Sequence, residues 1–227
     1  MSQSPPIQIF KRRARVSAAL AERFRAIPVA NISDCMQRIT AAGPRLRPMH
    51  AGGAMSGPAF TVKTRPGDNL LAHKALDLAE PGDVVVVDAG GDLTNAIMGE
   101  LMTGYAATRG IAGIVINGAI RDAETLGASS FPVYAAGVTH RGPYKDGPGQ
   151  INIAIAIDGM VIEPGDLIVG DADGVLCVPK DQAEAIHAAA HAKNEQEKLT
   201  IAQIAAGSLD TSWVDVALQR LGYVSEY

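Results

Sequence analysis

Residues 84–120 constrain the fold more than any other part of the chain. The run VVVVD at 84–88 is short, β-branched and closed by glycines, which is typical of a strand buried in a sheet. The segment GELMTGYAATRG at 99–110 indicates a helix ended by Gly110, and IAGIVINGAIRD at 111–122 indicates the next strand. A strand, a helix and a strand in this order predict two parallel strands joined by a right-handed crossover. The fold class is therefore expected to be α/β.

The first half of the chain predicts further helices and strands around this unit. Pro28 should end the first helix, and a second helix should begin near it. Its possible caps are Asn31, Ser33 and Asp34. The expected elements are a helix at 14–26, a helix from 31, a strand at 59–63, a helix at 69–79 and a strand at 131–137.

The second half of the chain has a different sequence pattern, in which short strand runs alternate with tight turns. Residues 150–179 offer three strand runs separated by turns at Asp158-Gly159, at Pro164-Gly165-Asp166 and at Asp173-Gly174, so antiparallel hairpins are expected. A long helix from Asp181 to Gly207 and a short one around 213–221 should follow. We expect residues 1–207 to form a single α/β catalytic domain that includes the long helix, and residues 208–227 to form a helical tail.

Composition narrows the class of protein. With 227 residues, 19% charged residues and a net charge of -4, the chain is typical of a soluble globular protein that does not bind nucleic acid. Cys35 and Cys177 lack the spacing of a disulfide framework or a zinc site. The sequence offers no signal peptide and no apolar run of membrane-spanning length. We therefore expect a cytoplasmic protein without a membrane partner.

The charged residues of the strand–helix–strand segment should meet at one edge of the sheet. Glu100 falls in the first turn of the predicted helix, and Arg121 and Asp122 follow the next strand. Ligands of open α/β sheets bind at the carboxyl ends of the strands. The two carboxylates are hard oxygen ligands suited to Mg²⁺ or Mn²⁺, and Arg121 can offer a planar fork to a carboxylate or to an enolate oxygen.

The start of the same helix is a possible anion site. Its free backbone N–H groups, near Gly99, Leu101 and Met102, can hold a carboxylate. The alternative is that Glu100 only complements the helix dipole and that the Arg-Asp pair has a role in a surface turn.

Other conspicuous residues have simpler interpretations. Lys63, Lys74 and Lys145 are candidates for a Schiff base, but Lys145 lies in the polar loop GPYKDGPG, which is unlike the apolar site such chemistry needs. His140 and Arg141 are expected to be a solvated pair rather than a subsite for a second carboxylate. His187 and His191 share one helix face without a metal motif, so packing or surface exposure is expected.

The segment GELMTGYAATRGIAGIVINGAIRD resembles the signature of a family of class II pyruvate aldolases. These enzymes cleave 4-hydroxy-4-methyl-2-oxoglutarate, and the family also contains the regulator of ribonuclease activity A. In the signature a glycine precedes an acid, and 20 residues separate that acid from Arg-Asp; Gly99-Glu100 and Arg121-Asp122 match it. The flanking runs PGDVVVVDAGG and VIEPGDLIVGDADGVLCVP are also similar, so the resemblance covers about residues 30–207.

The resemblance implies a lyase with a metal-bound pyruvate site. Asp122 would bind a divalent cation directly, Glu100 would hold it through a water, and Arg121 would contact the keto oxygen. The backbone of Leu101 and Met102 would bind the substrate carboxylate. The implied substrate is 4-hydroxy-4-methyl-2-oxoglutarate or 4-carboxy-4-hydroxy-2-oxoadipate, with decarboxylation of oxaloacetate as a side activity through the same pyruvate enolate.

The resemblance also implies an architecture and an assembly. The family fold is a swivelling β/β/α-type sandwich, assembled as homotrimers or homohexamers, in which a neighbouring subunit adds a glutamate that holds the metal through water. Glu197 is the first choice for that residue and Glu195 the second. Two positions depart from the pattern, because the aldolases commonly have Asp at the position of Glu100 and often an acid at that of Asn117. A non-catalytic regulator that binds a ribonuclease is the alternative function.

Overall fold

The computed structural model describes residues 7–38 and 42–223. It forms two compact units, Met1–Ala190 and His191–Tyr227, and the division lies within the long helix α6. The boundary expected at residue 207 remains a prediction. The helices are α1 (Ala18–Phe24), α2 (Val29–Cys35), α3 (Leu70–Leu78), α4 (Glu100–Thr108), α5 (Ala123–Ala128), α6 (Ala183–Ala205) and α7 (Ser212–Arg220). The strands are β1 (Ile7–Ile9), β2 (Arg47–Pro48), β3 (Met55–Thr64), β4 (Val84–Asp88), β5 (Ala96–Met98), β6 (Gly113–Ile120), β7 (Val133–Val138), β8 (Gly149–Ile151), β9 (Ile155–Ile157), β10 (Met160–Ile162), β11 (Leu167–Gly170) and β12 (Val175–Val178).

One large sheet forms the centre of the first unit. Its main path runs β1-β8-β3-β4-β6-β7-β2, while β5 lies beside β6 and β11 pairs with both β3 and β12. Strands β3, β4, β6 and β7 are parallel, so their carboxyl ends meet at one edge. The register places Val84 opposite Gly113 and Asp88 opposite Asn117, which confirms the parallel pair predicted within residues 84–120.

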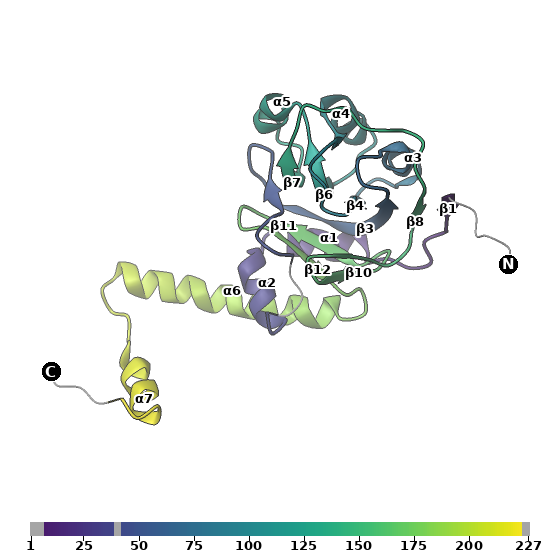
Figure 1. The fold of residues 1–227 in the computed structure, drawn as a ribbon. Coiled ribbons are helices and arrows are strands. Elements are labelled where there is room, and N and C mark those ends of the chain that lie inside the picture. The colour runs from purple at the N-terminus through teal and green to yellow at the C-terminus, as the bar shows by residue number, and fades with distance from the viewer. Residues whose placement is uncertain (1–6, 39–41, 224–227) are drawn as a thin grey trace. The chain divides into compact units, whose positions relative to one another are not determined.

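Both faces of the central strands are covered. Every residue of β4 and β6 is buried, which explains the unbroken apolar run of each strand. On one face, Val85 and Ile116 share a core with α3, α4 and α5, which Figure 1 shows together on one side of the sheet. On the other face, Val84 and Val115 pack with residues of β9, β10, β11 and β12.

A second apolar layer lies behind the hairpin of β11 and β12. Leu167 and Val178 share a buried cluster with Phe24 of α1, Ile32 of α2 and the first turns of α6. The hairpin is therefore enclosed between the main sheet and a layer of helices. This arrangement is the α/β sandwich with a βαβ unit that the sequence predicts, and solved structures share it.

Two helix boundaries predicted from sequence are wrong. The first helix starts at Ala18 rather than at residue 14, because the Ser17 hydroxyl accepts the N–H of Leu20 at 3.1 Å and the preceding residues are extended. The second helix starts directly after Pro28. The residues expected to cap it therefore lie inside it, and these are Asn31, Ser33 and Asp34.

The strands of the second half also differ from expectation in one respect. Antiparallel hairpins form across Asp158-Gly159 and across Asp173-Gly174, as predicted. The turn at 164–166 does not make a hairpin, because β11 pairs with β3 instead of β10. Strand β5 was also not expected, since its three residues are too few to give a period in the sequence.

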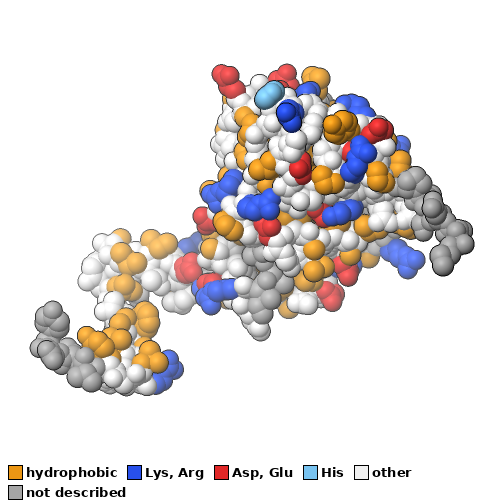
Figure 2. All heavy atoms as spheres, viewed as in Figure 1, with side chains coloured by type: hydrophobic (Ala, Val, Ile, Leu, Met, Phe, Trp, Pro, Cys, Tyr) orange, Lys and Arg blue, Asp and Glu red, His pale blue; other side chains and the backbone are white. Residues whose placement is uncertain are grey.

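The second unit consists of the rest of α6 and α7. Helix α7 confirms the short helix predicted around 213–221. Trp213 and Val216 on this helix and Leu221 at its end are exposed. Figure 2 shows apolar side chains on the surface of α7. Within the described ranges, no helix combines the length and apolar composition needed to cross a membrane.

Candidate functional site

The candidate site lies where the chain turns from β5 into α4, beside the end of β6. Strand β5 is parallel to β6, and the N–H of Arg121 donates to the carbonyl of Met98 at 2.9 Å. Gly99, which precedes α4, therefore lies against Arg121 and Asp122. The structure thus brings the start of the helix and the Arg-Asp pair together at the carboxyl edge of the sheet.

Asp122 is held by the first turn of α4. Its Oδ2 accepts the backbone N–H of Glu100 at 3.0 Å and lies 3.7 Å from Nε of Arg121. The backbone of Asp122 is left-handed, with φ of 57°, a conformation that costs energy for a residue with a side chain. The side chain is 33% exposed, so it is anchored and still accessible to a ligand.

Gly99 leaves no room for a side chain. A Cβ at this position would lie 2.2 Å from Oδ2 of Asp122 and 2.8 Å from Cγ of Arg121. Its φ of -151° is ordinary extended backbone, so the requirement for glycine comes from the close approach alone. This glycine therefore fixes the distance between the helix start and the Arg-Asp pair.

The first turn of α4 presents two backbone N–H groups that are free to bind a ligand, those of Leu101 and Met102. The N–H of Glu100 is used by Asp122, and the N–H of Thr103 donates to the carbonyl of Gly99 at 3.1 Å. Between them, the N–H groups of Leu101 and Met102 donate to no described residue. Two adjacent free donors at the positive end of a helix can bind a carboxylate.

A cavity of about 200 Å³ adjoins these groups. Arg121 borders it, and also borders a hollow of about 300 Å³ that includes Asp122 and His140. Glu100 lines neither space, and its side chain is exposed beside them. The residues that line the smaller cavity are Asn69, His73, Ala96, Ile97, Met98, Gly99, Leu101, Met102, Arg121, Pro143 and Lys145.

Three residues of this cavity were missed as site residues in the sequence. Asn69 is buried and donates from Nδ2 to the carbonyl of Ile97 at 2.9 Å, whereas Lys145 is exposed at the rim. Partial burial and the nearby ammonium of Lys145 lower the pKa of His73, although its side chain still reaches solvent. No local pattern marks these residues, because they come from α3 and from a distant loop.

The loop that carries Lys145 is held in place by Asp68. This carboxylate is 1% exposed and accepts a hydrogen bond from Nη2 of Arg65 at 3.2 Å. It also accepts from three backbone N–H groups, those of Leu70, Asp146 and Gly147. Burial by itself raises the pKa of Asp68, but these hydrogen bonds outweigh burial and keep the pKa below its ordinary value. Asp68 therefore joins the start of α3 to the loop on the opposite wall of the cavity.

The donor set can be tested for its fit to a divalent cation. Asp122 and Glu100 offer carboxylate oxygens, the ligand type that Mg²⁺ and Mn²⁺ prefer. Among residues 7–38 and 42–223, no group of three or more His, Cys, Asp or Glu side chains is arranged to hold a metal ion. A cation here would keep several water ligands, as Mg²⁺ commonly does, so the residues fit such an ion.

The other residues considered in the sequence lie elsewhere. Lys63 forms an ion pair with buried Asp88. The Asp88 carboxylate also accepts a hydrogen bond from Nδ2 of Asn117 at 3.0 Å. Asn117 therefore supports the end of β4 and lines neither space beside Arg121. His187 is buried, stacks edge-on against a phenylalanine and serves packing, as expected.

The glutamates considered for a neighbouring site form ion pairs within α6. Glu197 lies 3.1 Å from Nζ of Lys193, and Glu195 lies 2.7 Å from Nζ of Lys198. The Glu195 pair is solvent-exposed and the Glu197 pair is partly exposed, and such pairs contribute little stability. Either carboxylate can therefore exchange its partner at small cost.

Comparison with known proteins places the chain in a family. A family model described as "RraA-like: Aldolase/RraA" matches residues 29–177. The chain belongs to this RraA-like family. A protein of Halalkalibacterium halodurans with the provisional name 4-hydroxy-4-methyl-2-oxoglutarate aldolase is 47% identical over 162 residues, which is 71% of this chain and 77% of that protein.

Solved structures of the RraA-like family share the fold. The RNA-processing inhibitor RraA from Thermus thermophilus matches with a TM-score of 0.63 and 28% identity, over 67% of this chain and 93% of that chain. RraAS2 of Streptomyces coelicolor, described as an unusual member of the RNase ES inhibitor RraA family, matches with a TM-score of 0.74 and 26% identity, over 82% and 98%. The family thus contains proteins named as aldolases and proteins named as inhibitors of RNA processing.

Proposed function

We propose that this protein is a metal-dependent pyruvate aldolase that cleaves 4-hydroxy-4-methyl-2-oxoglutarate or 4-carboxy-4-hydroxy-2-oxoadipate. The observation that carries the proposal is the contact of Gly99 with Arg121 and Asp122, beside two free N–H groups at the start of α4. This arrangement offers a guanidinium, a carboxylate and a turn that can bind a carboxylate, beside two spaces that share Arg121. The aldolase names of relatives support the same conclusion.

The first role of the chain is to bind and orient the 2-oxo acid end of the substrate. The N–H groups of Leu101 and Met102 would hold the C1 carboxylate, and Arg121 would lie beside the C2 oxygen. When the bond between C3 and C4 breaks, its electron pair moves to C3 and then to the C2 oxygen as an enolate. A preformed cation beside that oxygen stabilises the developing charge more than it stabilises the substrate.

Proton transfer completes the cleavage. The C4 hydroxyl loses its proton as C4 becomes a carbonyl, and Glu100 would accept that proton through a water. Return of a proton to C3 then gives pyruvate and the second oxo acid. Loss of CO₂ from oxaloacetate leaves the same enolate, so decarboxylation is the expected side activity.

Asp122 and Glu100 would hold the cation, Asp122 directly and Glu100 through water. A bound Mg²⁺ or Mn²⁺ supplies Lewis-acid stabilisation of the enolate charge. The chain's own part is to fix the ligands, and the hydrogen bond from the Glu100 N–H to Asp122 does so.

The proposal includes a homo-oligomer, trimeric or hexameric, in the cytoplasm. Glu197 of a neighbouring subunit, or else Glu195, would orient the waters of the cation. The partner of the site is a small oxo acid rather than a nucleic acid or a membrane. On the face drawn in Figure 2, basic and acidic side chains of the first unit are interspersed, which is unlike a nucleic-acid interface.

A non-catalytic regulator of a ribonuclease is the second candidate. It is supported by the two RNA-processing inhibitors that share the fold. A surface that only binds a protein does not require a glycine pressed against an Arg-Asp pair. The two functions therefore differ in what they predict for Arg121.

Pyruvate release from oxaloacetate and from 4-hydroxy-4-methyl-2-oxoglutarate tests the proposal. Arg121→Ala should lower turnover about 100-fold or more and leave the fold intact, because loss of one preformed oxyanion donor typically costs that much. Arg38→Ala removes an arginine that is 73% exposed in the turn after α2, and it should leave turnover unchanged. Unchanged turnover in Arg121→Ala, or no pyruvate release by the wild type, would contradict the proposal.

A further inference from the structure

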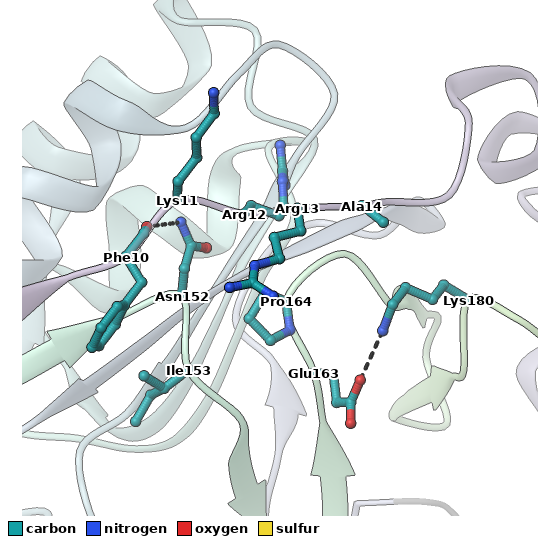
Figure 3. A pocket seen from close by; sticks show the side chains of 10 residues that line it. All are labelled: Phe10, Lys11, Arg12, Arg13, Ala14, Asn152, Ile153, Glu163, Pro164 and Lys180. Carbon is teal, nitrogen blue, oxygen red and sulfur yellow. Dashed lines mark hydrogen bonds and ion pairs between the residues drawn. The ribbon is translucent and has the colours of Figure 1, made fainter.

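A larger cavity lies away from the proposed aldolase site. It has a volume of about 640 Å³, which is within the usual range for small-molecule sites. Figure 3 shows that the extended segment 10–14 forms one wall, while Asn152 and Ile153 and the turn at Pro164 form the others. None of the residues around Arg121 borders this space.

The walls of the cavity are fixed by contacts on both sides. Arg12 donates to the carboxylate of Asp83 at 2.8 Å and lies over the ring of Phe60, so the segment is anchored from behind. Gly165 lies so close to the same segment that a Cβ on it would be 1.9 Å from the carbonyl oxygen of Ala14. The space is therefore formed before any ligand binds, which reduces the entropic cost of binding.

Two cations that border this cavity have no partner in the described chain, and the Lys11 side chain points away from Phe10 and Ile153 (Figure 3). The basic run 11–15 divides its charges, because Arg12 and Arg15 form ion pairs with Asp83 while Lys11 and Arg13 form none with a described residue. At the other end of the cavity, Lys180 is neutralised by Glu163 at 2.8 Å (Figure 3). A protein of net charge -4 thus leaves an excess of positive charge in this cavity.

Asn152 adds a polar acceptor to the wall. Its Nδ2 donates to the carbonyl of Phe10 at 2.9 Å, and this fixes which way the amide faces (Figure 3). Its Oδ1 is buried and has no hydrogen-bond partner among the described residues, and its backbone is left-handed with φ of 59°. A buried acceptor without a donor calls for a water, which can donate its second hydrogen to a bound anion, and a strained backbone often marks a functional position.

The remaining lining is apolar. Phe10 is 45% exposed, and Ile153 and Pro164 lie beside it along the cavity. Such a surface favours the flat carbon skeleton of a ligand, whereas the cations favour a negative group. A free inorganic anion would satisfy only the second requirement.

We propose that this cavity is a second ligand site, which binds an organic acid with a flat apolar body. The body lies on Phe10 and Ile153, and the anionic group is held by Arg13. The site is separate from the aldolase function, so it stands or falls independently of it.

Binding of benzoate to the full chain tests the proposal, with benzamide as the neutral analogue and inorganic phosphate as the anion without a body. Calorimetry should show saturable binding of benzoate, and at least tenfold weaker binding of the other two. Spectra with ¹⁵N labels should show a shift of the Asn152 side-chain amide as benzoate binds. Equal binding of benzamide, or a benzoate response that never saturates, would overturn the proposal.

Variants locate the site. Arg13→Gln should weaken benzoate binding about tenfold or more, the usual effect of removing a charged hydrogen-bond donor. The Arg13 side chain is exposed, so the fold should not change. Lys74→Gln, which removes an exposed cation of α3, and Arg121→Ala, which alters the aldolase site, should leave binding unchanged. Loss of binding in Arg121→Ala with retention in Arg13→Gln would place benzoate in the aldolase site and refute the proposal.

Discussion

Gly99→Ala is the smallest change that should disable the site. The added Cβ would lie 2.2 Å from Oδ2 of Asp122, about 1.2 Å closer than the 3.4 Å at which ordinary contact begins. Asp122 cannot easily retreat, because its Oδ2 is bonded to the Glu100 N–H at 3.0 Å and its backbone is already left-handed. The carboxylate and the helix start must therefore separate by about 1 Å. A displacement of this size typically costs about 100-fold in rate.

The assay is the rate of pyruvate release at saturating substrate, measured together with the melting temperature. Gly104→Ala is the matched control, because this glycine lies in the same helix and a Cβ on it would meet nothing within 4 Å. It should keep full activity and gain about 0.5–1 kcal/mol of stability, the usual effect of replacing glycine inside a helix. If Gly99→Ala kept wild-type turnover, the close approach would have no catalytic meaning and the reasoning would be refuted.

Three other outcomes test neighbouring parts of the account. The pKa of Asp68 is below its ordinary 3.8 in the folded state, so its ionised form stabilises the fold above about pH 4, and this contribution is lost as the pH falls through the folded-state value. The difference in melting temperature between the wild type and Asp68→Asn should therefore shrink below about pH 4, and a constant difference would count against this clamp. Asp122→Ala should abolish Mn²⁺ binding in calorimetry without unfolding the protein, and retained binding would remove Asp122 from the metal site. Mixing Asp122→Ala with Glu197→Ala under subunit exchange should restore part of the activity, because some interfaces then regain both carboxylates; no recovery after proven exchange would argue against a shared site.

The βαβ unit could be predicted because its signals are local. The run at 84–88, the glycine before Glu100 and the apolar strand that ends at Arg121 each lie within a few residues of the element they define. Parallel pairing then dictates that the start of α4 and the end of β6 meet at one edge. The contact of Gly99 with the Arg-Asp pair follows from this topology.

The rest of the site depends on contacts between distant segments. Asp68 binds the backbone of Asp146 and Gly147, which are 78 and 79 residues away, and no sequence period reports such a bond. The polar residues around Lys145 predict a solvated loop. The hydrogen bonds to Asp68 nevertheless hold this loop at the rim of the cavity. The predicted start of the first helix was wrong for a related reason. Ser17 follows an extended basic segment, and a distant residue, buried Asp83, holds that segment in place.

The most direct test of the central claim is pyruvate release in the presence of a metal chelator. The account predicts that release from oxaloacetate or 4-hydroxy-4-methyl-2-oxoglutarate stops with the chelator and returns when Mg²⁺ or Mn²⁺ is added in excess. Full activity in the chelator, together with inactivation by borohydride in the presence of substrate, would show that a lysine Schiff base carries the reaction and would contradict the account.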